Sequence, residues 1–264
     1  MIYCNLKGGL GNMMFQIAAT KSYAIDLGVE PSFPNLTNQM EVINNDLIHN
    51  PSIKHAFEYE IIFNSLKREH PTNTTELVRF PFEYVDYEIR DNSTVDGFFQ
   101  SEKYFNHNRE EVLKIFKKPD TITEYIEKKY NNILSGNTVS LHVRRGDYLK
   151  FPNHHKVLTL DYYDKALSFF KDDFKIIVFS DDIEWCKQNL NNKVDHFIEG
   201  EKDYIELYMM SLCKNNIISN SSFSWWGAWL NENENKKIIA PKEWFGPAIQ
   251  HNTNDIIPDN WIKI

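Results

Sequence analysis

Apolar and polar positions alternate in two different ways along the second half of the chain. Short apolar runs rich in β-branched residues predict strands at 138–143, 174–179, 193–198, 216–218 and 237–240. Between them, apolar residues recur at helical spacing and predict helices at 160–170, 182–190, 203–212 and 222–230. This repeated order of strand and helix predicts a parallel, doubly wound α/β sheet.

The first half opens with the same kind of unit. Residues 2–6 predict a strand, a glycine-rich turn follows, and residues 10–27 predict a helix that ends at Gly28. Further along, residues 108–116 and 120–134 also predict helices. The first half is therefore expected to be α/β as well.

Residues 34–96 show no clear period and are rich in Asn, Pro and charge. A loop of that length is uncommon in a compact domain, so we expect short elements within it, including an extended segment at Phe80–Tyr87. Their order cannot be predicted. The Gly136-Asn137 pair predicts a boundary between two domains, 1–136 and 137–264.

Composition narrows the class of protein. The chain has 264 residues, 42% hydrophobic and 25% charged, which is typical of a globular protein of two domains. A formal net charge of −8 disfavours general nucleic-acid binding. Three scattered cysteines without a C-x-x-C spacing disfavour a zinc or disulfide scaffold and favour reduced thiols in the cytoplasm.

Membrane segments are not expected from the sequence. The N-terminal residues 1–7 predict a strand and lack the features of a signal peptide. No run of roughly eighteen apolar residues predicts a transmembrane helix. Peripheral membrane association and the oligomeric state stay open.

The richest candidate chemistry lies in His142-Val143-Arg144-Arg145-Gly146-Asp147-Tyr148, directly after a predicted buried strand. Ligands of open α/β sheets bind at the carboxyl ends of strands, and a guanidinium suits phosphate oxygens. Arg144 and Arg145 are therefore candidates for a diphosphate clamp. The alternatives are an incidental Arg-Gly-Asp sequence and an ordinary surface ion pair between Arg145 and Asp147.

Two turns are candidates for binding anions. Gly8-Gly9-Leu10-Gly11 precedes a predicted helix, whose N-terminus favours anions; a dinucleotide-binding fingerprint fits poorly because Met14 replaces the third glycine. Hydroxyls and amides of 219–223, at a strand-to-helix turn, also suit phosphate. A structural turn without a ligand, or a helix cap, is the alternative in each case.

Two further groups have simpler interpretations. Asp181-Asp182 could be mistaken for a metal-binding Asp-x-Asp motif, but we favour a helix N-cap. The tryptophans at 225, 226 and 229 are interpreted as core residues of a helix packed on the sheet.

Four blocks together resemble the bacterial type of α-1,2-fucosyltransferase in glycosyltransferase family 11. They are Gly8–Ala18, Gly97–Phe105, His142–Tyr148 and Ser219–Leu230, in the family's order along most of the chain. The resemblance implies a GT-B-like fold, with two Rossmann-like domains that face each other across a cleft. It also implies inverting transfer of L-fucose from GDP-β-L-fucose to a β-galactoside, with no metal or other cofactor.

The resemblance also implies roles for residues of the second domain, which would bind GDP-fucose while residues 1–136 form the acceptor side. Arg144 would bind the diphosphate and stabilise the departing charge, and His142 would point toward the nucleotide. Arg145 would be a second contact or would hold the loop. For Asp147 the roles of general base, acceptor contact and orienting carboxylate stay open, and we favour the last.

The remaining predicted contacts are spread over three segments. Glu206 would accept hydrogen bonds from guanine N1–H and N2–H, although Glu201 and Asp203 are nearby acids. The diphosphate contacts would come from the loop residues Ser221, Ser222 and Phe223. Gly11 and Asn12 would face the donor from the first domain. The alternatives are fucosyl transfer of another linkage (α-1,6 or O-linked), a non-catalytic GDP-sugar-binding domain, and an NAD oxidoreductase.

Overall fold

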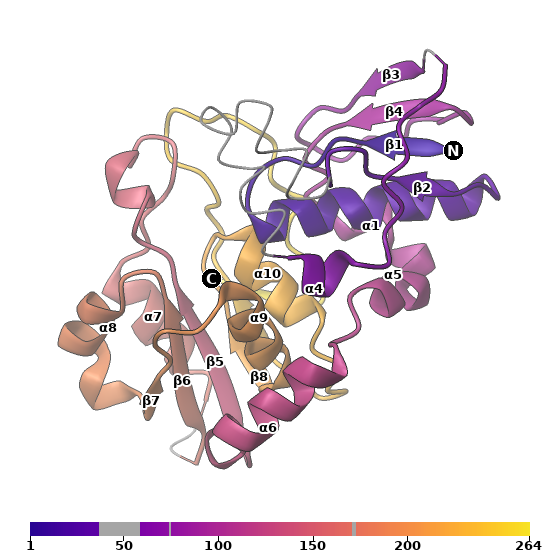
Figure 1. The fold of residues 1–264 in the computed structure, drawn as a ribbon. Coiled ribbons are helices and arrows are strands. Elements are labelled where there is room, and N and C mark those ends of the chain that lie inside the picture. The colour runs from indigo at the N-terminus through magenta and orange to yellow at the C-terminus, as the bar shows by residue number, and fades with distance from the viewer. Residues whose placement is uncertain (37–58, 74, 171–172) are drawn as a thin grey trace. The chain divides into compact units, whose positions relative to one another are not determined.

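The described residues form two compact units (Figure 1). The structure, a computed structural model, describes residues 1–36, 59–73, 75–170 and 173–264. Unit 1 comprises Met1–Pro119 with Asn252–Pro258, and unit 2 comprises Asp120–His251 with Asp259–Ile264. The division at Pro119 differs from the boundary predicted at residue 136. The reason is helix α6 (Asp120–Leu134), which packs against α9 (Asp203–Leu212) of unit 2.

Unit 1 is built on a parallel four-stranded sheet of order β2-β1-β4-β3. Its strands are β1 (Ile2–Cys4), β2 (Pro31–Ser32), β3 (Glu76–Arg79) and β4 (Ser93–Asp96). Its helices are α1 (Leu10–Asp26), α4 (Glu60–Phe63), α5 (Arg109–Ile115) and the 3-10 turns η2 (Glu102–Tyr104) and η3 (Asn106–Asn108). The sequence predicted β1, α1 and α5 within a few residues, and the short elements expected inside 34–96 include β3 and β4.

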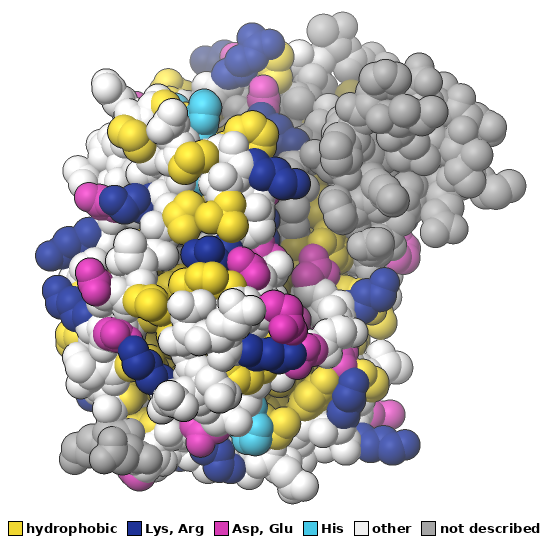
Figure 2. All heavy atoms as spheres, turned by 90° about the vertical axis from the view of Figure 1, so that its left-hand side faces the viewer, with side chains coloured by type: hydrophobic (Ala, Val, Ile, Leu, Met, Phe, Trp, Pro, Cys, Tyr) yellow, Lys and Arg dark blue, Asp and Glu magenta, His cyan; other side chains and the backbone are white. Residues whose placement is uncertain are grey.

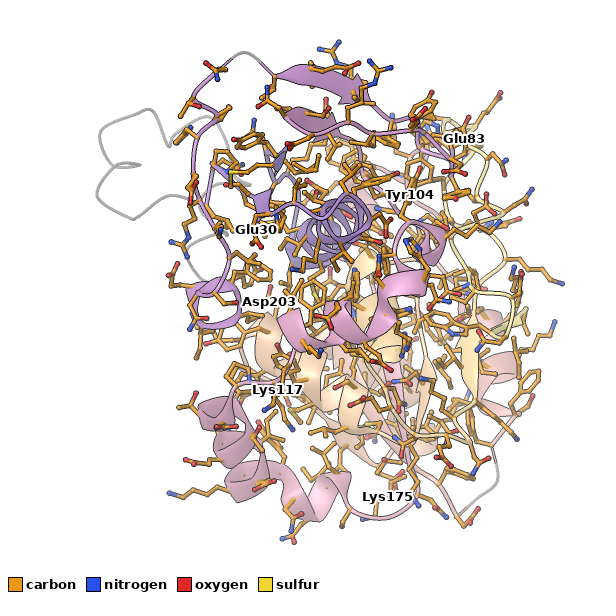
Figure 3. The ribbon with its side chains drawn as sticks, turned by 90° about the vertical axis from the view of Figure 1, so that its right-hand side faces the viewer. Glu30, Glu83, Tyr104, Lys117, Lys175 and Asp203 are labelled. Atoms are coloured by element: carbon orange, nitrogen blue, oxygen red, sulfur yellow. The ribbon has the colours of Figure 1, made fainter. Side chains whose placement is uncertain are left out.

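The expected extended segment at Phe80–Tyr87 is not a strand. Only its first residue, Phe80, still bonds to β4, through its N–H to the Asp96 carbonyl at 2.8 Å, and a side chain holds the backbone further along. The Tyr104 hydroxyl donates to the Glu83 carbonyl at 3.2 Å and accepts from the Val85 N–H at 3.1 Å (Figure 3). Pro81 also lacks the N–H that a central strand would need.

Unit 2 contains a parallel six-stranded sheet of order β10-β9-β8-β5-β6-β7. Its strands are β5 (Thr138–Val143), β6 (Lys175–Ser180), β7 (His196–Phe197), β8 (Asn215–Ile217), β9 (Ile238–Ala240) and β10 (Ile262–Lys263). Numbered from β5, this is the doubly wound order 3-2-1-4-5-6, whose direction reverses between β5 and β8. The prediction of a parallel, doubly wound sheet is therefore confirmed, although β10 was not predicted.

Helices of unit 2 agree closely with the helical periodicity. Besides α6 and α9 they are α7 (Leu160–Leu167), α8 (Ile183–Leu190), α10 (Ser222–Trp229) and the 3-10 turns η4 (Tyr148–Lys150) and η5 (Asn191–Lys193). The largest difference is in α7, which ends three residues before the predicted end at Phe170. Ser168 caps it, and the Ser168 hydroxyl donates to the Lys165 carbonyl at 2.7 Å, which tightens the last turn.

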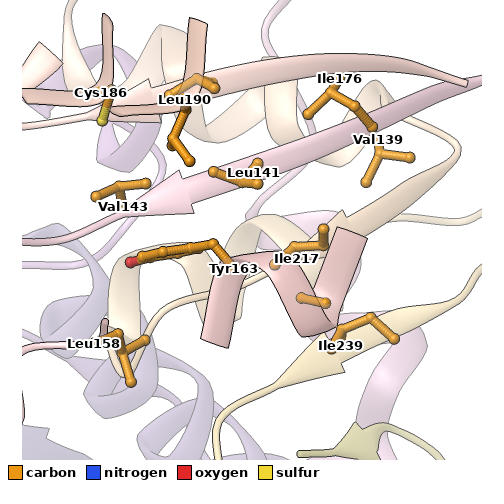
Figure 4. Packing of buried hydrophobic residues seen from close by; sticks show 12 residues of the cluster. Val139, Leu141, Val143, Leu158, Tyr163, Ile176, Cys186, Leu190, Ile217 and Ile239 are labelled. Carbon is orange, nitrogen blue, oxygen red and sulfur yellow. The ribbon is translucent and has the colours of Figure 1, made fainter. Parts of the chain in front are cut away.

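One face of β5 fixes the strand in a hydrophobic core. Val139, Leu141 and Val143 are fully buried and pack with side chains of β6, β8, β9, α7 and α8 (Figure 4). Burial of such a side chain contributes about 1.5–3 kcal/mol. Because successive strand residues point to opposite faces, Ser140 and His142 point away from this core.

Helix α10 covers the other face. Trp225, Trp226 and Trp229 are buried and packed against one another, with ring centroids 5.1–6.2 Å apart, so their interpretation as core residues is confirmed. Gly227 allows α10 to approach α9, because a Cβ there would lie 2.9 Å from the Met210 Cβ. The N-terminus of α10 lies beside the end of β5, where the ring of Phe223 contacts that of His142.

Candidate active site

The polar side chain of His142 lies at the carboxyl end of β5, where the strand order reverses. Its Nδ1 is 2.8 Å from the Ser219 hydroxyl, just after β8, and its ring centroid is 5.5 Å from that of Phe223 in α10. Burial, with the nearby charge of Arg144, lowers the pKa of His142 to about 3. The imidazole is therefore neutral at physiological pH, and it links the ends of both strands to α10.

Arg144 is fixed between two carboxylates. Its Nη2 lies 2.7 Å from Asp147 Oδ1, its Nε lies 3.2 Å from Asp181 Oδ2, and its guanidinium lies 5.5 Å from the ring centroid of Tyr148. About one third of the side chain (32%) stays exposed. The guanidinium is thus held in one orientation while part of its surface is free to meet a ligand. Asp147 pairs with Arg144, as an orienting carboxylate would.

Arg145 is engaged more completely. Its Nε donates to Asp182 Oδ2 at 3.0 Å, its guanidinium lies 3.9 Å from the Trp185 ring centroid, and its side chain is 15% exposed. The sequence left two roles open for Arg145. Its contacts with Asp182 and Trp185 are those expected of a residue that holds the loop. A stacked guanidinium with a carboxylate partner has little surface left for phosphate.

The two aspartates after β6 hold the clamp loop from the neighbouring strand. Asp182 also caps α8, where its Oδ1 accepts from the Trp185 N–H at 3.3 Å, so the prediction of an N-cap is confirmed. Asp181 Oδ1 accepts from the Arg145 N–H at 2.9 Å. Sequence reasoning missed both ion pairs to arginine. Parallel pairing of β5 with β6 brings the two strand ends together. A prediction that these consecutive strands are neighbours could therefore have indicated the ion pairs.

Across the described ranges 1–36, 59–73, 75–170 and 173–264, no group of three or more His, Cys, Asp or Glu side chains could hold a metal ion. The two aspartates after β6 are instead bonded to arginines and to backbone amides, as above.

Gly146 is required by the close approach of Asp181. A Cβ at this position would lie 2.6 Å from Asp181 Oδ2, the oxygen that pairs with Arg144. We expect Gly146→Ala to displace that carboxylate and lower kcat about tenfold, because misplaced catalytic groups lose rate steeply. Steady-state kinetics together with a melting curve check this expectation. An unchanged kcat would show that Asp181 is not needed.

The serines in and after the turn before α10 make different contacts. Ser219 binds His142, and the Ser224 hydroxyl donates to the Ser219 and Ser221 carbonyls at 3.4 and 3.3 Å. Ser221 is the N-cap, and Ser222 and Phe223 are the first two helical residues. Amides at those positions have no acceptor within a helix, so they are available for an anion.

Glu206 lies in the first turns of α9 and is partly buried. Burial raises its pKa to about 8, with further contributions from the charges of Asp203, Glu201 and Asp181. Among the described residues its carboxyl has no hydrogen-bond partner. Glu201 differs, because its carboxylate accepts from Tyr130 at 2.6 Å and from Tyr125 at 2.9 Å. Of these two acids, only Glu206 is left without a structural bond.

Gly11 and Asn12 lie in unit 1, at the start of α1. Asn12 Oδ1 accepts from Gln100 Nε2 at 2.8 Å, a contact that sequence reasoning missed although Gln100 lies in one of the four blocks. All the other predicted site residues belong to unit 2. Of these, the residues of β5, its loop and α10 gather at the reversal of strand order, and Glu206 lies on α9.

Comparison with known proteins identifies the family. The model of glycosyl transferase family 11 matches residues 1–264. The chain is 33% identical to an α-1,2-colitosyltransferase of Escherichia coli, over 100% of this chain and 99% of that protein. It is 29% identical to the E. coli O-antigen biosynthesis glycosyltransferase WbnK, over the full length of both. With galactoside α-(1,2)-fucosyltransferase 1 of Homo sapiens it shares 29% identity over 56% of this chain and 45% of that protein.

Solved structures show the same fold at low identity. Fucosyltransferase NodZ from Bradyrhizobium superposes with a TM-score of 0.51 at 14% identity, covering 86% of this chain and 92% of that one. POFUT1 in complex with GDP-fucose gives 0.51 at 11% identity, covering 90% and 97%. The fold is thus GT-B-like, as predicted.

Charge and hydropathy fit such an enzyme. Lys and Arg are interspersed with Asp and Glu over the face in Figure 2, without a continuous basic stripe. In the described part of the chain, no helix combines the length and apolar character needed to span a bilayer. With a family model that matches from end to end, the chain belongs to glycosyltransferase family 11 and is a glycosyltransferase.

Proposed function

We propose that the protein transfers L-fucose from GDP-β-L-fucose to the 2-hydroxyl of a terminal galactose, with inversion at the anomeric carbon. One observation carries the proposal: Arg144, held by Asp147 and Asp181, lies in the loop after β5, and β5 is tied through His142 to the turn that begins α10. That is a fixed cation beside free helix amides at the end of a parallel sheet, which suits a diphosphate.

The reaction divides between bond cleavage and attack. The bond from the fucose C1 to the β-phosphate oxygen breaks, and the negative charge that develops on the diphosphate is stabilised by Arg144 and the amides of Ser222 and Phe223. The galactose 2-oxygen attacks C1 from the opposite face, and its proton leaves to a base or to water. Asp147 is engaged with Arg144 in this scheme, so it acts as an orienting group and not as the base.

The guanine base is assigned to Glu206. An ionised carboxylate can accept from guanine N1–H and N2–H together, whereas adenine offers no such pair of donors. The Glu206 carboxyl is partly buried and has no partner among the described residues, so a ligand with two donors would satisfy it. Unit 2 therefore supplies the nucleotide site in this proposal, and unit 1 the acceptor side.

One comparison suggests an alternative sugar donor. The α-1,2-colitosyltransferase is 33% identical over the whole chain, so activated colitose is the alternative sugar. Fucosyl transfer of another linkage and a binding domain without activity are further outcomes of the same test.

The deciding experiment measures GDP release by the purified protein with GDP-fucose, with and without β-galactosides, together with product mass and linkage. Acceptor-dependent release with fucose on galactose O2 is the expected result. A parallel reaction with activated colitose tests the alternative donor. Binding of GDP without release on any acceptor would contradict enzymatic fucosyl transfer.

We propose that the reaction needs no metal, because Arg144 and the helix amides supply the positive charge that a metal would provide. EDTA is therefore expected to leave the transfer rate largely unchanged. The check is the rate before and after EDTA and after added Mg²⁺ or Mn²⁺. A strict metal requirement would reassign Asp181 and Asp182 as ligands.

A further inference from the structure

A strained residue precedes Gln100 in the block Gly97–Phe105. Phe99 adopts φ +51°, a left-handed conformation that costs a bulky residue about 1–3 kcal/mol. Its buried ring is held by Phe80 and Tyr104, with centroids 4.8 and 5.2 Å away. Gly97 makes room for this packing, because a Cβ there would lie 2.8 Å from the Phe80 Cβ. The aromatic cluster thus stabilises the left-handed backbone conformation at Phe99, the residue before Gln100.

The side chain of Gln100 is only half satisfied. It is 9% exposed, its Nε2 donates to Asn12 Oδ1 at 2.8 Å, and its buried Oε1 has no partner among the described residues. A buried acceptor without a donor costs about 1–3 kcal/mol. Two unfavourable features therefore fall on adjacent residues, a pattern that is concentrated at binding and catalytic sites.

Hydrogen bonds and close packing hold the backbone around Asn12. Gln16 Nε2 donates to the carbonyls of Asn12 and Lys7 at 2.9 and 2.8 Å, and Gln16 Oε1 accepts from the Lys7 N–H at 2.9 Å. Gly8, at φ +85°, lies so close to Asn12 that a Cβ would be 2.6 Å from Nδ2. Asn12 Oδ1 accepts from Gln100, which leaves the N–H groups of the Asn12 amide as donors for a ligand.

We propose that Gln100 Oε1 accepts a hydrogen bond from a hydroxyl of the bound sugar, while its Nε2 orients Asn12 as a donor. Phosphate oxygens at neutral pH carry no proton for an empty acceptor, whereas a sugar hydroxyl both donates and accepts. Because Oε1 is shielded from bulk water, this bond would form without competition from solvent. The inference rests on the proposed function and adds a sugar-binding residue in unit 1.

The test compares Gln100→Met, which keeps length and removes both polar atoms, with wild type on substrates that each lack one hydroxyl. The panel contains monodeoxy β-galactosides and monodeoxy fucosyl analogues of GDP-fucose. One analogue should lower the wild-type kcat/KM about two- to twelvefold, the range for one neutral hydrogen bond. Gln100→Met should be slower on the parent substrates and show no further loss with that analogue. Gln188→Met, on the exposed surface of α8, is the matched control and should keep the wild-type pattern.

Equal additional losses with every analogue in Gln100→Met would overturn the inference, because a purely structural role gives additive effects. A separate readout covers failure of the proposed function: the melting temperature with and without free L-fucose or D-galactose. If wild type transfers no fucose but one sugar stabilises it and not Gln100→Met, the sugar contact stands and the reaction does not. If wild type shows neither transfer nor stabilisation, the sugar contact is refuted as well.

Discussion

Replacing Arg144 with alanine is expected to lower kcat about 10²–10³-fold while the protein stays folded, the range for a lost transition-state donor. The guanidinium is held by Asp147 and Asp181 but is one third exposed, so its removal leaves two carboxylates that water can still reach. The charge it stabilises develops as GDP departs, so kcat should fall more than the affinity for GDP-fucose. Initial rates across donor concentrations, with circular dichroism, measure both.

Two further variants define what Arg144 does. Arg144→Lys keeps the charge but lacks the planar guanidinium whose separate nitrogens meet Asp147 and Asp181, so it should recover only part of the rate. Asp147→Asn should lose less than Arg144→Ala if Asp147 only orients the guanidinium. Arg90→Ala, at an exposed arginine of unit 1, controls for loss of surface charge. Near-normal turnover of Arg144→Ala would refute the clamp, and a larger loss in Asp147→Asn would make Asp147 the base.

The second large effect is expected at Glu206. Glu206→Gln should weaken GDP binding about 10–100-fold, the value of hydrogen bonds to a charged acceptor, and leave the acceptor KM little changed. Because burial raises the pKa of Glu206 to about 8 in the free protein, the wild-type affinity should rise about tenfold per pH unit from 6 to 8 and then level off. The variant should lack this pH dependence. Calorimetric titration with GDP at each pH tests both points.

The contribution of Glu206 to folding stability should fall as pH rises, whereas the affinity for GDP should increase. The Glu206 carboxyl has an ordinary pKa near 4.5 and a raised one of about 8 in the folded protein, so folding takes up a proton between these values. Stability from this group is complete below pH 4.5, falls as pH rises to 8, and is constant above that. Glu206→Gln should therefore raise the melting temperature more at pH 8 than at pH 5. Equal shifts at both pH values would show that the carboxyl is not buried in this way.

Residues close in sequence were predicted well. Helices 120–134 and 203–212 were predicted to the residue, because their apolar positions follow one helical face and Asp opens each first turn. The loop after β5 was predicted to be a binding site because two arginines follow an apolar strand, and this stays a prediction. Both inferences use local pattern alone.

Features that depend on distant residues were missed. The pairing of Arg145 with Asp182 joins adjacent strand ends 37 residues apart, and the Gln100 contact with Asn12 spans 88 residues. Strand β10 has only two residues, too few for a periodic signal. The conformation of the segment after Phe80 depends on hydrogen bonds to the distant Tyr104 hydroxyl, which no local pattern encodes.

The path of the chain has a consequence for producing its parts separately. After Pro119 the chain builds unit 2, returns to unit 1 for residues 252–258, and closes with β10 on the edge of β9. A product cut at His251 would lose that edge strand together with Trp261, whose ring centroid is 5.4 Å from Trp225 in α10. A fragment that contains unit 2 alone therefore needs residues 259–264 joined to residue 251 by a short linker, so a single pair of cloning boundaries cannot define it.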